Sequence, residues 1–134
     1  MVRLPATAVD HVGIVAESEA TPLSAALGSE PVVTRRMPSG VEVGRFGPGA
    51  ALELVRPGSS PNPVEGYLAK RGPGLHHLGL RVEEPLGPLV EVLAAAGIAT
   101  TGPIEPAADG RPSVFLHPRG TGGVLVELVE GPPR

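Results

Sequence analysis

The sequence contains no cysteine, no tryptophan, one tyrosine and two phenylalanines in 134 residues. Without cysteine the protein has neither disulfide bonds nor a thiol nucleophile, which is typical of proteins that work in the reducing cytoplasm. Because aromatic side chains are scarce, valine, leucine and alanine must fill most of the core. We therefore expect a cytoplasmic protein with an aliphatic core, and we exclude enzymes that use a cysteine nucleophile.

The sequence also has no excess of positive charge and no long apolar run. Its formal net charge is -3 at pH 7, so it offers no general electrostatic attraction to nucleic acid or to an anionic membrane surface. No apolar stretch is long enough to span a bilayer, and the N-terminus lacks the apolar core of a signal peptide. We expect neither nucleic acid nor membrane among its partners.

Glycine and proline, by contrast, are abundant, with 19 and 17 residues, while 41% of all residues are hydrophobic. The glycines and prolines cluster between segments with regular apolar spacing, where they mark turns. A chain of this length suits one compact domain with a single core. We therefore expect a loop-rich, folded domain that covers residues 1–134.

One segment of the sequence occurs twice. Val9–Ala16, VDHVGIVA, aligns with Leu75–Val82, LHHLGLRV, so that His11 corresponds to His77. The two histidines are 66 positions apart, half the length of the chain. In both copies apolar residues alternate with the histidine and a glycine, as in a half-buried strand. The chain is therefore predicted to be a duplicated module.

A second repeat lies later in each copy. Ala51–Val55, ALELV, aligns with Leu125–Val129, LVELV, which places Glu53 on Glu127. Each copy thus contains an early histidine and a late glutamate on strands that are otherwise apolar. Burying a bare carboxylate is costly, so each glutamate needs either solvent or a cation.

Four residues at these related positions are candidate ligands of a divalent metal ion: His11, Glu53, His77 and Glu127. Two imidazoles and two carboxylates suit cobalt, manganese, nickel, zinc or ferrous iron, and they do not choose among these metals. Such a set leaves coordination positions for a substrate. A single histidine on a strand is more often a structural residue, but the repeated pattern favours a metal site.

Three further polar residues have a structural and a functional interpretation. Glu42 is either a solvated carboxylate on an edge strand or a general base that faces the metal. His76 points to the opposite face of its strand from His77, so we expect it to be packed or hydrogen-bonded. His117 precedes Pro118, and we expect it to be a turn residue.

Apolar spacing predicts the same order of elements in each copy, namely a strand, a helix and three strands. In the first copy we expect strands at 8–16, 32–36, 40–46 and 50–56, and a short helix from 21 to 27. In the second copy we expect strands at 75–82, 98–100, 113–117 and 124–129, a helix at 86–96 and a long loop at 105–112. Module one then covers about 8–57, the linker covers 58–73 with a helical segment at 64–70, and module two covers about 74–130.

The repeated segments resemble those of the vicinal oxygen chelate superfamily, which includes glyoxalase I, extradiol dioxygenases, resistance proteins and methylmalonyl-CoA epimerases. Two segments are most similar to the epimerases: Asn62–Glu84, NPVEGYLAKRGPGLHHLGLRVEE, and Val114–Glu130, VFLHPRGTGGVLVELVE. This resemblance implies an α+β fold in which duplicated βαβββ modules form an open, cupped mixed sheet around a metal ion.

The resemblance also implies ligands and a reaction. His11, His77 and Glu127 would bind the metal, and Glu53 occupies a position where family members have a Glu or Gln near it. The reaction would be inversion at C2 of methylmalonyl-CoA, or of a closely related acyl-CoA, through an enolate that a divalent ion stabilises. Glu42 and Glu127 are then the candidate catalytic carboxylates, and a homodimer is expected.

The chain departs from the epimerase pattern in its first half, which leaves other functions open. Its first helix is short, aromatic residues are few, and Gly44 and Arg45 lie in a strand where family members are usually apolar. Lys70, Arg71 and Arg119 are either contacts for CoA phosphates or solvated loop charges. The alternatives are a glyoxalase-like metal-dependent lyase or isomerase, and a non-catalytic small-molecule binding or resistance protein on the same fold.

Overall fold

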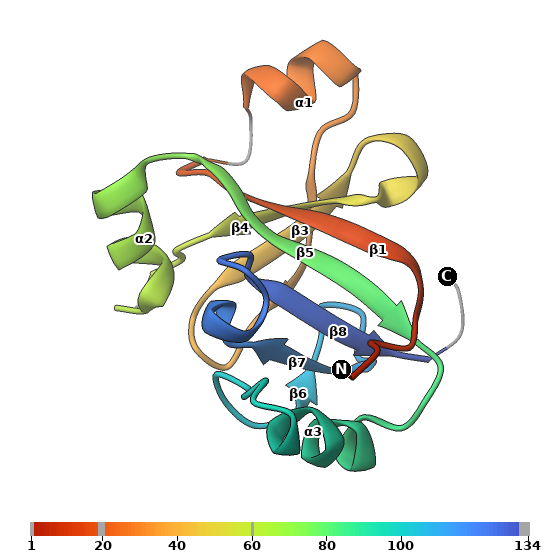
Figure 1. Cartoon of the computed structure of the whole chain (residues 1–134). Coiled ribbons are helices and arrows are strands. Elements are labelled where there is room, and N and C mark those ends of the chain that lie inside the picture. Colours follow the sequence, from red (N-terminus) through yellow and green to blue (C-terminus); the bar gives the residue numbers. More distant parts are fainter. Residues whose placement is uncertain (1, 19–20, 60, 132–134) are drawn as a thin grey trace. The chain divides into compact units, whose positions relative to one another are not determined.

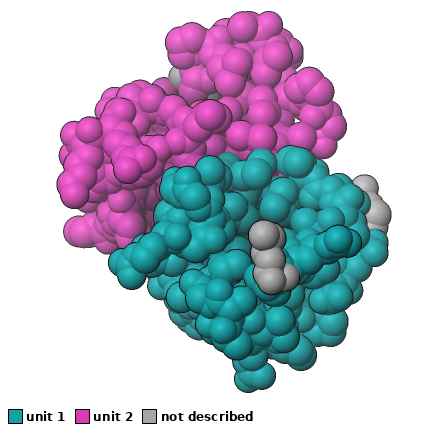
Figure 2. Space-filling model, viewed as in Figure 1, with its two compact units in different colours: residues 1–10, 77–134 teal, residues 11–76 magenta. Residues whose placement is uncertain are grey.

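The computed structural model describes residues 2–18, 21–59 and 61–131 (Figure 1). The chain divides into two compact units, one of residues 11–76 and one of residues 1–10 together with 77–134 (Figure 2). We call them the first and the second unit. The prediction of one domain with modules at about 8–57 and 74–130 stays a prediction.

The first unit contains the N-terminal half of the strands. Its elements are β1 (Ala6–Val15), which begins in the second unit, α1 (Pro22–Leu27), β2 (Val32–Arg36), β3 (Glu42–Phe46), the 3-10 helix η1 (Pro48–Ala50), β4 (Leu52–Arg56) and α2 (Pro63–Arg71). The strand order is β2-β3-β4-β1. Strand β1 is parallel to β4, whereas β3 is antiparallel to both β2 and β4.

The short helix α1 ends at the residue that the sequence predicts and begins one residue later, at Pro22. Thr21 is the N-cap, and its hydroxyl accepts a hydrogen bond from the backbone N–H of Ser24. Pro22 occupies the first turn, where a missing N–H is harmless. Gly28 ends the helix with φ 63°, a left-handed conformation that glycine adopts without strain.

The second unit repeats the strand pattern of the first. Its elements are β5 (Gly74–Val82), which begins in the first unit, α3 (Leu86–Ala95), β6 (Glu105–Pro106), β7 (Pro112–Leu116), the 3-10 helix η2 (Pro118–Gly120) and β8 (Val126–Glu130). The strand order is β5-β8-β7-β6, with β5 parallel to β8 and β7 antiparallel to both β8 and β6.

Helix α3 covers the core of the second unit with one apolar face. Leu86, Leu89 and Leu93 recur at helical spacing, and all three are buried. They join a cluster of buried strand residues: Val82, Val114, Leu116, Val126 and Leu128. The first unit has a smaller buried cluster: Ala16, Phe46 and Leu54.

Most predicted elements are confirmed, with ends that differ by no more than two residues, but the region after α3 differs. The strand expected at 98–100 is reduced to a single bridge between Thr100 and Leu116. Gly102 and Pro103 follow after Thr101, and proline cannot donate to a strand ladder. The expected loop at 105–112 begins with the two-residue strand β6. In the described part of the chain the helices reach at most 10 residues, so none could cross a lipid bilayer.

Candidate metal-binding residues

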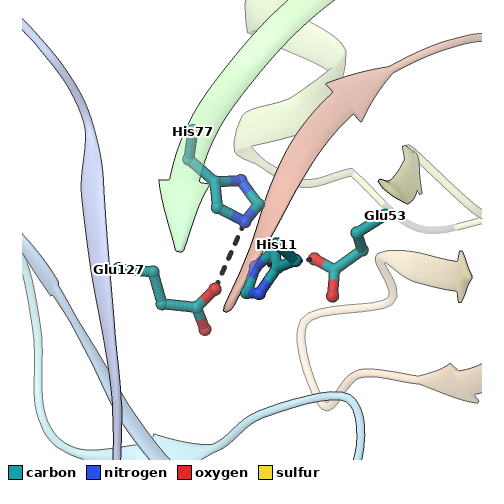
Figure 3. Close-up of side chains that lie close together, drawn as sticks. All are labelled: His11, Glu53, His77 and Glu127. Atoms are coloured by element: carbon teal, nitrogen blue, oxygen red, sulfur yellow. Dashed lines mark ion pairs between the residues drawn. The ribbon is translucent and has the colours of Figure 1, made fainter. Parts of the chain in front are cut away.

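In the first unit, two parallel strands place His11 beside Glu53. The register pairs Gly13 on β1 with Glu53 on β4. His11 lies two residues before Gly13, so its side chain projects from the same face of the strand. Both side chains are buried, and His11 Nε2 lies 3.8 Å from Glu53 Oε1 (Figure 3). The strand register therefore brings one imidazole and one carboxylate together inside this unit.

Glu53 has a second partner, Arg45, which the sequence analysis did not count among the site residues. Arg45 lies directly opposite Glu53 in the antiparallel pair β3–β4. Its Nε donates to Glu53 Oε2 at 3.1 Å, and its Nη1 donates to the carbonyl of Ala50 at 3.3 Å. The two glutamate oxygens thus face different groups, Oε1 toward His11 and Oε2 toward Arg45.

In the second unit, the same register brings His77 beside Glu127. Gly79 on β5 pairs with Glu127 on β8, and His77 lies two residues before Gly79. His77 Nε2 is 3.2 Å from Glu127 Oε1, and both residues are buried (Figure 3). Phe115, which is opposite Glu127 on β7, packs edge-on against the His77 ring with a centroid separation of 5.2 Å.

The chemistry of these donors fits a divalent metal ion. Each unit supplies a buried ring nitrogen and a buried carboxylate oxygen, which are ligands that borderline first-row metals accept. All four predicted ligands are buried donors of this kind: His11, Glu53, His77 and Glu127. Which metal would bind is not decided by this donor set.

Glu42 lies on the other face of β3 from Arg45, because the two residues are three positions apart on one strand. Its carboxylate accepts a hydrogen bond from Arg36 Nη2 at 2.7 Å and forms an ion pair with Arg56 Nη2 at 3.0 Å. Both arginines are its neighbours in the strand ladder. The structure therefore pairs Glu42 with arginines and does not bring it to the His11–Glu53 pair; its role as a base stays a prediction.

A second buried ion pair lies next to the first candidate ligand. Asp10 precedes His11 in β1, and both of its carboxylate oxygens accept from Arg111 Nη2, at 2.9 and 3.0 Å. Arg111 also donates to Asp109 at 2.8 Å. Burial lowers the pKa of Arg111, but hydrogen bonds and charge attraction from Asp10 and Asp109 together raise it above its usual value. The sequence analysis missed this pair, whose members are 101 positions apart.

The two other histidines have structural contacts. The His76 ring packs edge-on against Tyr67 with centroids 5.0 Å apart, as expected for a packed residue. His117 is the N-cap of η2, and its Nδ1 accepts from the backbone N–H of Arg119 at 3.1 Å. This contact confirms His117 as a turn residue.

The sequence is similar to proteins named as epimerases, although no family model matches. A mitochondrial methylmalonyl-CoA epimerase of Dictyostelium discoideum is 38% identical over 81 residues, 59% of this chain and 48% of that protein. An ethylmalonyl-CoA/methylmalonyl-CoA epimerase of Cereibacter sphaeroides is 38% identical over 84 residues, 60% of this chain and 62% of that protein. The matched segment spans about half the length of the first of these relatives.

Solved structures match along almost the whole chain. A hypothetical protein of Bacillus halodurans has a TM-score of 0.81 at 28% identity, covering 95% of this chain and 96% of that one. Methylmalonyl-CoA epimerase of Mycobacterium tuberculosis has a TM-score of 0.76 at 27% identity, covering 99% of this chain and 93% of that one. A methylmalonyl-CoA epimerase in complex with methylmalonyl-CoA has a TM-score of 0.80 at 25% identity, covering 94% and 95%. The chain therefore has the vicinal oxygen chelate fold, as predicted, and is similar to methylmalonyl-CoA epimerases in sequence and structure.

Proposed function

We propose that this protein is a metal-dependent epimerase that inverts C2 of methylmalonyl-CoA or of a closely related acyl-CoA. The observation that carries the proposal is the repeated pair of a buried histidine and a buried glutamate, one pair in each unit, at 3.8 and 3.2 Å. The similarity to enzymes named methylmalonyl-CoA epimerase supports the choice of reaction.

We further propose that the two pairs bind one divalent ion, with His11, Glu53, His77 and Glu127 as ligands. Burial of both glutamates supports this assignment, because a buried carboxylate is stabilised by a cation. The proposal requires the two modules to form a single domain. Cobalt, manganese, nickel, zinc and ferrous iron all remain suitable, since imidazole and carboxylate ligands accept each of them.

The reaction needs a proton to leave C2 on one face and a proton to return on the other. A bound divalent ion would supply Lewis-acid stabilisation of the negative charge that develops on the substrate oxygens. Glu127 is our candidate for handling a proton, because its buried carboxylate lies against the His77 ring. Glu42 is the second candidate, and its carboxylate would first have to leave Arg36 and Arg56.

The substrate class rests on the relatives as well. One solved epimerase is described in complex with methylmalonyl-CoA, and a Streptomyces coelicolor epimerase in complex with 2-nitronate-propionyl-CoA. Lys70 and Arg71 end helix α2 with two exposed positive charges, which suit the phosphates of a CoA. The cytoplasmic location, the homodimer and the absence of nucleic-acid partners stay predictions.

Proton exchange tests the proposed reaction directly. Protein loaded with Co²⁺ is incubated with one epimer of methylmalonyl-CoA in deuterated water, and mass spectrometry follows uptake of deuterium at C2. We expect exchange that depends on the protein and is abolished by a chelator. Binding of the acyl-CoA without exchange would instead favour the binding or resistance protein, and conversion to another product the glyoxalase-like alternative.

A further inference from the structure

The duplicated modules differ at one position beside the candidate metal ligands. In the first unit the residue opposite Glu53 on the neighbouring antiparallel strand is Arg45. In the second unit the residue opposite Glu127 in the corresponding strand pair is Phe115. The two positions are equivalent in the repeat, so one glutamate faces a permanent positive charge and the other faces an aromatic ring.

The arginine is held in place rather than solvated. The side chain of Arg45 is only 10% exposed. A buried guanidinium is tolerated when it is paired, and Glu53 Oε2 at 3.1 Å and the carbonyl of Ala50 at 3.3 Å supply partners. Because Oε2 is engaged with Arg45, Oε1 is the glutamate oxygen on the His11 side. Arg45 therefore orients Glu53 as a donor through one oxygen.

Arg45 also changes the charge of the site. Two ionised glutamates and a divalent cation sum to zero when the histidines are neutral, and Arg45 leaves one positive charge in addition. Phe115 contributes no charge to the second glutamate. In a buried site an uncompensated charge is costly, so a ligand that brings a negative charge is favoured over a neutral one.

We propose that Arg45 is a positioning and specificity residue: it holds Glu53 as a single-oxygen donor and favours ligands that carry a carboxylate beside a carbonyl group. This inference rests on the proposed function and assigns to Arg45 the selection of the free carboxylate that methylmalonyl-CoA carries. Arg45 acts through Glu53 and through its charge. Its removal should therefore weaken the preference for ligands that carry a carboxylate and raise the affinity for the metal ion.

The first experiment measures the metal alone. Metal-free wild type, Arg45→Met, Arg45→Gln and Arg45→Lys are titrated with Co²⁺ by calorimetry. We expect Arg45→Met and Arg45→Gln to bind Co²⁺ about tenfold more tightly, because a neighbouring positive charge has been removed, and Arg45→Lys to stay near the wild type. Arg3→Met removes the same charge from an exposed position in the second unit and should leave the affinity unchanged.

The second experiment measures selectivity on the Co²⁺-loaded proteins. Malonate and the neutral malonamide serve as probes, and the visible spectrum of Co²⁺ reports their binding. We expect Arg45→Met and Arg45→Gln to lose about tenfold in malonate affinity with malonamide affinity unchanged, and Arg45→Lys to restore the preference. Glutamine keeps a hydrogen-bond donor for Glu53, so Arg45→Gln separates the charge from the contact. It also carries the test should Arg45→Met fail to fold.

The two proposals fail in different ways. If wild type binds Co²⁺ and exchanges the C2 proton, but the Arg45 variants keep the wild-type ratio of malonate to malonamide affinity, the role of Arg45 is wrong and the epimerase proposal stands. If wild type binds no Co²⁺, both are wrong. If the affinities for malonate and malonamide fall in equal proportion, Arg45 has a purely structural role, and the inference is also wrong.

Discussion

The two units carry the same His–Glu pair in different surroundings. In both, the glutamate is paired with a glycine across a parallel strand pair, and the histidine lies two residues before that glycine. The neighbours differ, since Arg45 is bonded to Glu53 whereas Phe115 packs against His77. Strand register has therefore preserved the donor geometry through the duplication, while the charge around each donor pair has diverged.

The difference suggests a division of labour. A carboxylate that is held by a guanidinium has one oxygen committed to that contact. Glu127 has the aromatic neighbour, and Glu53 has the guanidinium. We therefore expect the second unit to supply the carboxylate that handles the proton and the first unit to supply the charge that selects the substrate.

Removal of one histidine from either pair should have the largest effect. His77→Ala and His11→Ala each delete a proposed nitrogen ligand, so we expect each to lower Co²⁺ affinity by more than about 100-fold, beyond the usual effect of outer-shell changes. Calorimetric titration measures the affinity, and C2 exchange should be lost in parallel. His76→Ala, which removes a ring that packs on Tyr67, is the matched control. Full metal occupancy in His77→Ala would remove this residue from the ligand set.

Core truncation compares the stability of the two units. Leu54 and Leu128 occupy equivalent positions on β4 and β8, and each is at most 1% exposed. Leu128 belongs to the larger buried cluster, so the cavity left by Leu128→Ala is less able to collapse. We expect unfolding free energies to fall by about 4 kcal/mol for Leu128→Ala and about 3 kcal/mol for Leu54→Ala. Urea denaturation measures both, and a larger loss for Leu54→Ala would contradict the difference between the clusters.

Removal of the buried Asp10–Arg111 ion pair in the second unit should have the next largest effect on the free energy of unfolding. Arg111→Met leaves Asp10 buried without its guanidinium, and we expect a loss of about 3 kcal/mol of unfolding free energy. Because the pKa of Arg111 is raised, its contribution is present at all lower pH values and is lost only as the pH rises through the folded-state pKa. Ionisation of Arg111 therefore adds no pH dependence between about pH 6 and pH 9, and the loss of unfolding free energy in Arg111→Met should be constant over that range.

The double variant Asp10→Asn with Arg111→Met provides the control for that result. It removes both charges, so it should recover part of the lost stability if the cost comes from a buried carboxylate that has lost its guanidinium. Urea unfolding of the wild type, Asp10→Asn, Arg111→Met and the double variant gives the complete double-mutant cycle. No recovery would mean that Arg111 acts through the packing of its aliphatic chain.

Sequence reasoning found the elements that depend on local patterns. The repeat located both His–Glu pairs, because one histidine and one glutamate per copy recur on apolar strands, and leucine spacing located α3. It could not find the partners that depend on pairing across the chain. The contact of Arg45 with Glu53 depends on the length of the turn at η1, and a turn one residue longer would put Arg45 on the other face.

The Asp10–Arg111 pair and the position of Glu42 also depend on pairing across the chain. Asp10 and Arg111 meet only after folding, and nothing in the local sequence of either predicts the other. The sequence allows two interpretations of Glu42, a solvated carboxylate on an edge strand and a base that faces the metal, and the face of the strand on which it lies decides between them. The face of a strand changes with every residue, so a short strand without clear alternation, such as EVGRF, leaves that choice open.

Substitution of Glu42 should have the smallest effect on stability, and it tests directly whether Glu42 is the general base. Glu42→Gln weakens ion pairs with Arg36 and Arg56, of which Arg36 is 60% exposed, so we expect a loss of about 1 kcal/mol or less in urea unfolding. The rate of C2 exchange separates the two roles. A general base contributes at least about 100-fold, so a fall of that size in a stably folded variant would establish Glu42 as the base. A rate near that of the wild type would confine Glu42 to its arginines and leave Glu127, on the second unit, as the only carboxylate of the two still proposed to carry the proton.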